Sequence, residues 1–216
     1  MSQDDLEYKI ILIGNGMVGK TCLFRKLKTG DFLENNISTI GVEKVSFDIN
    51  ITNKQNQNKK IDVSLFDTAG QEKFRAVTRQ FYKGTDGVLL LYDITNRDSF
   101  ENVEIWINSL SESIEDTKDT KYVIILYGNK TDLIGKLGKK REVEEEEAYN
   151  ICQQFNMTWG GEISIKEYSK DELMKLFEKN IQEIYDIIGE RSKNNQKVKK
   201  IKKHTKKKKC CAAKLL

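Results

Sequence analysis

The sequence predicts an α/β domain of three layers, in which helices cover both faces of a mostly parallel six-stranded sheet. Short apolar runs at residues 8–13, 87–92 and 122–127 have the length and composition of buried strands. Segments with helical spacing of apolar residues separate these runs, so strands and helices alternate along the chain. Alternation of this kind requires crossover connections, which place successive strands parallel in one sheet.

One strand is expected to run antiparallel to its neighbour. Apolar and polar residues alternate through residues 42–52 and again through residues 61–65, as in strands that bury one face. The segment 53–60 between them is purely polar. This pattern predicts a hairpin with a long loop.

Four helices are predicted from apolar spacing and from their caps. In the clearest one, Asp98 or Ser99 could cap the start, and apolar residues recur every three or four positions, at Phe100, Val103, Ile107, Leu110 and Ile114. The other predicted helices cover residues 19–28, 142–155 and 171–188, and a last strand is expected at 157–163.

Charge divides the chain into two parts. Residues 191–216 hold 12 of the 37 Lys and Arg residues and no Asp or Glu, so this segment carries +12. The remaining 25 basic residues stand against all 33 acidic ones, which gives the first 190 residues a net charge of −8. We expect a folded domain at residues 1–189 and a disordered basic tail at 190–216, which holds too few apolar residues to fold alone.

Composition also excludes several classes of protein. No apolar run approaches the roughly 18 residues that a membrane span needs. The first eight residues are polar and acidic, unlike a secretory signal. The four cysteines have no metal-ligand spacing and suggest no disulfide framework, so we expect a reducing cytosolic setting.

The strongest motif is GNGMVGKT at residues 14–21, which lies between a predicted strand and a predicted helix. It matches the pattern G-x-x-x-x-G-K-[ST] in the context that the pattern requires. Backbone N–H groups of such a loop can surround a phosphate, and the helix adds the positive end of its dipole. We expect Lys20 to neutralise the outer phosphates and Thr21 to ligate Mg²⁺. The sequence thus predicts a P-loop NTPase fold with nucleotide-binding residues Gly14, Asn15, Gly16, Met17, Val18, Gly19, Lys20, Thr21 and Cys22.

A second motif, DTAGQE at residues 67–72, follows the apolar end of a predicted strand. The Asp67 carboxylate could hold Mg²⁺ directly or through water. Gly70 lets a backbone N–H reach the terminal phosphate. The Gln71 amide can accept from and donate to an attacking water, which suits a positioning role in hydrolysis.

A third motif, NKTD at residues 129–132, also follows a strand. The Asp132 carboxylate could accept hydrogen bonds from the N1–H and N2–H₂ groups of guanine. Adenine offers no such pair of donors, so a buried Asp132 would stay unpaired against ATP, at a cost of a few kcal/mol. This motif makes guanine the predicted base.

Together, GNGMVGKT, STIG, DTAGQEKFR, GNKTD and EISIK resemble the Ras superfamily of small GTPases, over about residues 8–188. Within it, STIGVE, FYKGT, LLLYDIT and the C-terminal Cys-Cys are most similar to the Rab family. The resemblance implies a switch that cycles between GTP and GDP, hydrolyses GTP slowly and regulates vesicle trafficking. Two switch segments, near residues 33–45 and 69–82, would order around the γ-phosphate and meet exchange factors, GTPase-activating proteins and effectors.

The same resemblance assigns further roles. Thr39 would ligate Mg²⁺ and sense the γ-phosphate, and Thr39, Lys20 and Gln71 would act in hydrolysis. Phe32 would pack on the guanine ring. The base would also be bound by Asn129, Lys130, Asp132, Ser164, Ile165 and Lys166.

Three residues depart from the family pattern. Lys44 replaces an aromatic residue of an effector-facing apolar patch that Phe66 and Phe81 complete. Asn36 replaces a tyrosine. Ile165 replaces a small alanine, and its branched side chain is expected to crowd the base and weaken affinity.

The tail predicts membrane attachment. Nine lysines in residues 197–209 could each contribute on the order of 1 kcal/mol opposite an anionic leaflet. Cys210 and Cys211 are the expected lipidation sites, because one lipid chain alone anchors weakly. Ala213 stands fourth from the end, so the sequence does not match a CaaX motif. The expected location is the cytoplasmic face of an intracellular membrane, in exchange with the cytosol.

Other functions remain open at this stage. A basic tail also suits nuclear localisation or nucleic-acid binding, but it holds no aromatic residues for base stacking, so no nucleic-acid partner is expected. The departures above allow a pseudo-GTPase scaffold, and the tail allows a Ras- or Rho-like switch at the plasma membrane. We expect a monomer.

Overall fold

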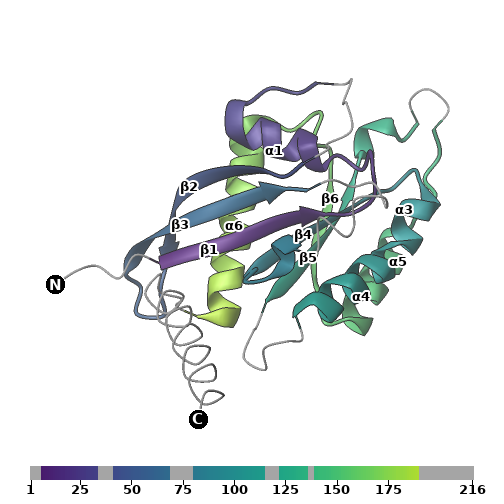
Figure 1. The fold of residues 1–216 in the computed structure, drawn as a ribbon. Coiled ribbons are helices and arrows are strands. Elements are labelled where there is room, and N and C mark those ends of the chain that lie inside the picture. Colours follow the sequence, from purple (N-terminus) through teal and green to yellow (C-terminus); the bar gives the residue numbers. More distant parts are fainter. Residues whose placement is uncertain (1–5, 34–40, 69–79, 115–121, 136–138, 190–216) are drawn as a thin grey trace, which may run out of the picture.

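The computed structural model describes residues 6–33, 41–68, 80–114, 122–135 and 139–189. Six strands form one sheet in the order β2-β3-β1-β4-β5-β6. Strand β2 is antiparallel to β3, and every other neighbouring pair is parallel (Figure 1). The predicted sheet is therefore confirmed, including its one antiparallel strand.

The strands lie close to their predicted positions. Their bounds are β1 Leu6–Ile13, β2 Glu43–Thr52, β3 Asn58–Asp67, β4 Gly87–Asp93, β5 Val123–Asn129 and β6 Thr158–Ile163. The helices are α1 Lys20–Thr29, α3 Arg97–Glu101, α4 Val103–Ile114, α5 Glu145–Gln154 and α6 Lys170–Ile188, with a short 3₁₀ turn at Thr131–Leu133.

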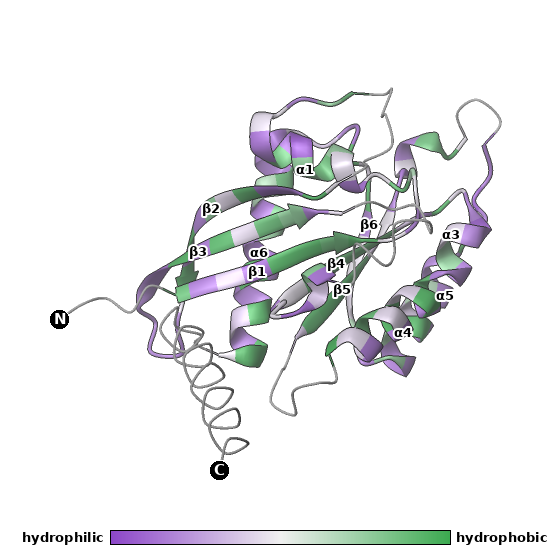
Figure 2. Cartoon of the chain, in the orientation of Figure 1, coloured by the Kyte–Doolittle hydropathy of each residue, from purple (hydrophilic) through white to green (hydrophobic). Residues whose placement is uncertain are grey.

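Two apolar cores, one on each face of the sheet, hold the three layers together. Successive side chains of a strand point to opposite faces, so Ile10 and Leu12 of β1 join one core and Ile11 and Ile13 the other. Helices α1 and α6 cover the first face, and α3, α4 and α5 cover the second (Figure 1). The second half of β1 is accordingly apolar without interruption (Figure 2), and β4 and β5 are buried at every residue.

The hairpin loop is shorter than predicted. Residues 58–60 belong to β3, where Asn58, Lys59 and Lys60 pair with the last residues of β2. Their polar side chains suit this position because β2 is an edge strand and Asn58 and Lys60 are exposed. The turn itself is closed by the Asn53 side chain, which accepts hydrogen bonds from the backbone of Gln55 and Gln57, both at 2.9 Å.

The cap predicted for the helix that contains Phe100 to Ile114, Asp98 or Ser99, was wrong. The cap is Asn96, whose side chain accepts from the Ser99 N–H at 3.0 Å. The segment is also divided, because α3 ends at Glu101 and α4 begins at Val103. Helix α5 begins three residues later than predicted, with Glu144 and Glu147 forming a reciprocal capping box.

Both cysteines in the described part of the chain, Cys22 and Cys152, are buried and form no disulfide. Burial raises the pKa of the Cys152 thiol to about 12. Among the described residues, no helix is both long enough and apolar enough to span a membrane.

Candidate functional site

The sequence motifs converge at one edge of the sheet. The P-loop follows β1, Asp67 ends β3, Asp93 ends β4 and Asn129 ends β5. These strands are parallel neighbours, so their carboxyl ends lie at the same edge. Ligands of open α/β sheets bind at this edge, and the loop after β6 brings Ser164, Ile165 and Lys166 to it.

The P-loop requires glycine at two positions. Gly14 has a φ of 132°, and a Cβ there would lie 2.2 Å from the Leu91 carbonyl oxygen. Gly19 has a φ of 109°, and its Cβ would lie 2.4 Å from the Asn129 side-chain nitrogen. The loop can therefore pack against β4 and β5 only without side chains at these two residues.

We expect Gly14→Ala to destabilise the fold by about 2–5 kcal/mol, from strained positive φ and from overpacking against backbone. The matched control is Gly84→Ala. Gly84 has a φ of 74° but nothing within 4 Å of its Cβ position. Gly84→Ala should therefore lower the free energy of unfolding by only about 1–2 kcal/mol. Urea unfolding at one fixed GDP concentration would measure both, and equal losses would contradict the packing argument.

The remaining P-loop residues are placed around a buried lysine. Lys20, in the first turn of α1, is 5% exposed and donates to the carbonyls of Gly14 and Asn15 at 2.9 and 2.7 Å. Gly16 and Met17 are exposed at the turn, whereas Val18 and Cys22 are buried in the core behind it. The Asn15 side chain accepts from Trp106 Nε1 of α4 at 2.8 Å, a contact that fixes the loop to the second core.

Thr21 and Asp67 meet beside this lysine. The Thr21 hydroxyl donates to Asp67 Oδ2 at 2.7 Å, although the two residues stand 46 positions apart. Asp67 is 1% exposed, and its Oδ1 is buried with no hydrogen-bond partner among the described residues. Burial raises the pKa of Asp67 and lowers that of Lys20, and each opposes the other's shift by its charge. A buried carboxylate oxygen beside a hydroxyl is suited to a hard divalent cation.

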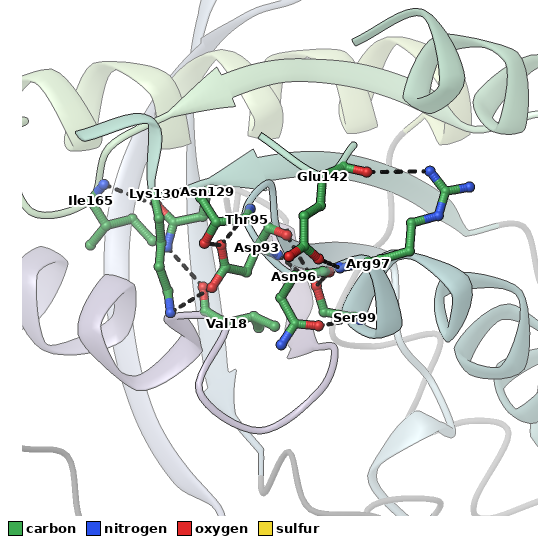
Figure 3. Close-up of polar contacts among 10 residues, drawn as sticks. All are labelled: Val18, Asp93, Thr95, Asn96, Arg97, Ser99, Asn129, Lys130, Glu142 and Ile165. Atoms are coloured by element: carbon green, nitrogen blue, oxygen red, sulfur yellow. Dashed lines mark hydrogen bonds and ion pairs between the residues drawn. The ribbon is translucent and has the colours of Figure 1, made fainter. Parts of the chain in front are cut away.

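The NKTD motif joins three loops. Asn129 donates to the Val18 carbonyl at 2.8 Å and accepts from the Ile165 N–H at 3.1 Å (Figure 3). Asp132 Oδ1 accepts from the Ser164 hydroxyl at 2.8 Å. The P-loop, the NKTD turn and the last loop thus form one hydrogen-bonded unit.

Sequence reasoning missed Asp93, at the end of β4. Its carboxylate pairs with Lys130 Nζ at 2.8 Å and accepts from the backbone and hydroxyl of Thr95 at 2.9 and 2.8 Å (Figure 3). The ion pair therefore holds the side chain of Lys130, whose backbone has a left-handed φ of 77°. Asp93 lies in the LLLYDIT motif, which indicated the family resemblance but assigned no role to this carboxylate.

Ile165 contributes its side chain to the core. It is 1% exposed, and its Cδ1 lies 3.4 Å from the place where a Cβ of Gly19 would be. The large side chain therefore fills space beneath the junction of P-loop and α1, while its backbone N–H stays within the loop network.

Ile165→Ala should accordingly act on stability. We expect a loss of about 2–5 kcal/mol in the free energy of unfolding, with the preference for guanine over adenine retained, because the backbone N–H remains. Ile187→Ala, at a residue of α6 that is 54% exposed, should stay within about 0.5 kcal/mol of wild type. Loss of base preference without loss of stability would show that the side chain acts on the base instead.

The patch that the resemblance predicts to face effectors has two aromatic residues, Phe66 and Phe81, and a cation, Lys44. Lys44 faces Phe66 across the β2–β3 pair, and its Nζ lies 5.7 Å from the Phe66 ring centroid. Lys9 Nζ lies 5.3 Å from the centroid of the same ring. The Phe81 ring packs against the Phe66 ring, with 6.4 Å between the two centroids. With Lys44 in place of the usual aromatic residue, the patch carries positive charge.

Several predicted residues lie outside the described part of the chain. They are Asn36, Thr39, Gly70, Gln71, Cys210 and Cys211. Phe32 is described and packs at the edge of the first core, beside Lys26.

Comparison with known proteins identifies the family. The model of the Ras family matches residues 9–207. The Ras-related protein Rab-19 of Xenopus laevis is 36% identical over 178 residues, which cover 82% of this chain and 78% of that protein. YPTC6 of Chlamydomonas reinhardtii is 36% identical over 87% of this chain and 81% of its own length. The GTP-binding protein ypt3 of Schizosaccharomyces pombe is 36% identical over 88% of this chain and 82% of its own length.

Rab and Ypt relatives of this kind favour a nucleotide-cycling enzyme over a pseudo-GTPase scaffold or a Ras- or Rho-like plasma-membrane switch. Members of the family bind GTP and GDP, hydrolyse GTP and act through exchange factors, GTPase-activating proteins and effectors, usually in vesicle trafficking. This chain belongs to the Ras family and is a Rab-like small GTPase.

Proposed function

We propose that the edge of the sheet described above binds the guanine nucleotide together with Mg²⁺, and that the P-loop holds its phosphates. Lys20 would turn from the carbonyls of Gly14 and Asn15 to the outer phosphate oxygens. The observation that carries this proposal is the Thr21–Asp67 pair with the unpartnered Asp67 Oδ1. These two residues would hold Mg²⁺, with Thr39 as a further ligand.

When bound, Mg²⁺ would neutralise charge on the phosphate oxygens. Thr39 and Lys20 would fix the γ-phosphate, Gly70 would donate its backbone N–H to it, and Gln71 would orient the attacking water. At the other end of the site, Asp132 would accept from guanine, Ser164 would hold that carboxylate in place, and Phe32 would pack on the ring. Asn129, Lys130, Ile165 and Lys166 complete the base site.

The metal assignment is tested by the rate of GDP release. Chelation of Mg²⁺ with EDTA should accelerate release of fluorescent GDP by wild-type protein. In Thr21→Ala the release should already be fast in Mg²⁺, and EDTA should add little. A Thr21→Ala protein with the wild-type response to EDTA would contradict the role of Thr21.

We also propose that residues 1–189 form the GTPase domain and act as a monomer, with residues 190–216 as its membrane tail. A chain cut after residue 189 should purify as a monomer that retains GDP. A truncated chain that is insoluble or empty of nucleotide would place the domain boundary elsewhere.

The tail would carry lipids on Cys210 and Cys211 and hold the protein on the cytoplasmic face of an intracellular membrane, in exchange with the cytosol. The combination of lipid and lysines follows from the weak anchoring of a single chain. Intact-mass analysis of native protein from the membrane fraction should show prenyl additions. Unmodified Cys210 and Cys211 in that fraction would refute the proposed lipidation.

A further inference from the structure

Lys26 is a buried cation of helix α1 that none of the motifs includes. It is 7% exposed, and its Nζ donates to the carbonyl oxygens of Ile165 and Lys166 at 2.8 and 2.9 Å. Among the described residues, its hydrogen-bond acceptors are these two carbonyls of the last loop. Without Lys26 these two carbonyls would lose a charged donor in a buried place.

The second carbonyl connects Lys26 to the guanine-reading carboxylate. In a trans peptide the C=O and the following N–H point in opposite directions. The Lys166 carbonyl points to Lys26, and the Glu167 N–H of the same peptide donates to the Ser164 hydroxyl oxygen at 3.0 Å. That hydroxyl in turn donates to Asp132 Oδ1 at 2.8 Å. A continuous chain of contacts therefore runs from Lys26 to Asp132.

The first carbonyl fixes the other part of the same loop. The Ile165 N–H donates to Asn129, while the Ile165 carbonyl accepts from Lys26. The residue is thus held at both ends of its backbone, between the NKTD turn and α1. A loop restrained in this way presents its backbone to the base in one conformation.

Lys26 also contacts the residue expected on the face of the base. Its Nζ lies 5.6 Å from the centroid of the Phe32 ring, a cation–π distance. One ammonium group therefore joins the loop at the edge of the base to the ring at its face.

We propose that Lys26 is a positioning residue for guanine, which slows nucleotide release and sharpens the choice of base by holding the last loop and Phe32 together. This inference rests on the assignment of Asp132, Ser164 and Phe32 to the base in the proposed function. The effect of Lys26 should be specific to guanine, because the chain of contacts ends at Asp132, the carboxylate proposed to accept from the guanine 2-amino group.

The test compares full-length Lys26→Met with wild type, each loaded with fluorescent GDP in Mg²⁺. Met keeps the length and helix propensity of the side chain but removes the charge and the donors. We expect GDP release about 10–100-fold faster, because two buried carbonyls of the last loop lose their charged donor. Inosine diphosphate lacks the 2-amino group, and the preference for GDP over it should fall at least about threefold, since Asp132 is less well held for its hydrogen bond to that group.

Two further variants separate positioning from general loss of structure. Lys28→Met changes a lysine of the same helix that also stacks on a ring, that of Phe24 at 5.6 Å, but has a side chain 46% exposed. It should keep the wild-type release rate and base preference. Lys26→Arg retains a charged donor, so its GDP release rate and its preference for GDP over inosine diphosphate should both lie close to those of wild type.

The outcomes are distinguishable. Wild-type release and wild-type preference in folded Lys26→Met would overturn the inference. If Lys26→Met does not fold, Lys26→Gln, which keeps an uncharged amide NH₂ donor group, should release GDP about fivefold faster. A wild-type rate with unchanged preference in that variant would equally overturn the inference. A wild-type protein that itself does not prefer GDP to inosine diphosphate would instead refute the proposed base site.

Discussion

Asp132→Ala is expected to lose about 10²–10⁴-fold in affinity for GDP. The carboxylate would accept two hydrogen bonds from guanine, each worth about 1.5–3 kcal/mol for a charged partner, and about 1.4 kcal/mol corresponds to a factor of ten. The Ser164 hydroxyl already orients this carboxylate at 2.8 Å. Competition between fluorescent GDP and unlabelled GDP or ADP would measure both affinity and base preference.

A second substitution at the same residue should change the preferred base. Xanthine carries a C2 carbonyl where guanine carries an amino group. An asparagine side chain at 132 offers one acceptor and one donor in place of two acceptors, so Asp132→Asn should favour xanthosine diphosphate over GDP. Asp171→Ala, at an exposed residue in the first turn of α6, should leave the preference unchanged. An Asp132→Asn protein that still prefers GDP would show that another residue reads the base.

Lys20→Met is expected to reduce the rate of GTP hydrolysis by about 10²–10³-fold. Loss of one preorganised donor to developing charge costs about that much in other enzymes, and Lys20 is a buried cation at the junction of the P-loop and α1. Phosphate release from GTP in single turnover would measure the effect, with binding followed separately.

The control for this prediction lies two turns along the same helix. Lys28→Met removes a cation with a half-exposed side chain at the end of α1 and should hydrolyse GTP at the wild-type rate. Circular dichroism establishes whether Lys20→Met remains folded, since the substitution also frees the carbonyls of Gly14 and Asn15. Wild-type hydrolysis by a folded Lys20→Met protein would refute the role of the lysine.

Local features of the fold could be predicted from the sequence. The central strands were evident because β4 and β5 are buried at every residue, which leaves an unbroken apolar run. The three motifs were evident because their spacing is contained within single loops. The start of β3 at Asn58 was missed because its polar residues face solvent on the hairpin at the sheet's edge.

Contacts between distant loops could not be predicted. Lys26 and Ile165 stand 139 residues apart, and Asn15 and Trp106 stand 91 apart. Nothing in the sequence around a buried lysine differs from that around an exposed one. Lys26 differs from Lys28 because it contacts the carbonyls of Ile165 and Lys166, in the loop after β6. Asp93 was missed for the same reason, because its partner Lys130 follows β5, the next strand of the sheet.

The measurement that tests the central claim most directly is nucleotide content and base competition for the purified wild-type protein in Mg²⁺. We expect GDP to co-purify, GTP to displace it and ATP to leave it bound, because Asp132, held by Ser164, would stay unpaired against adenine. A protein that carries no nucleotide and binds GTP and ATP alike would contradict the account.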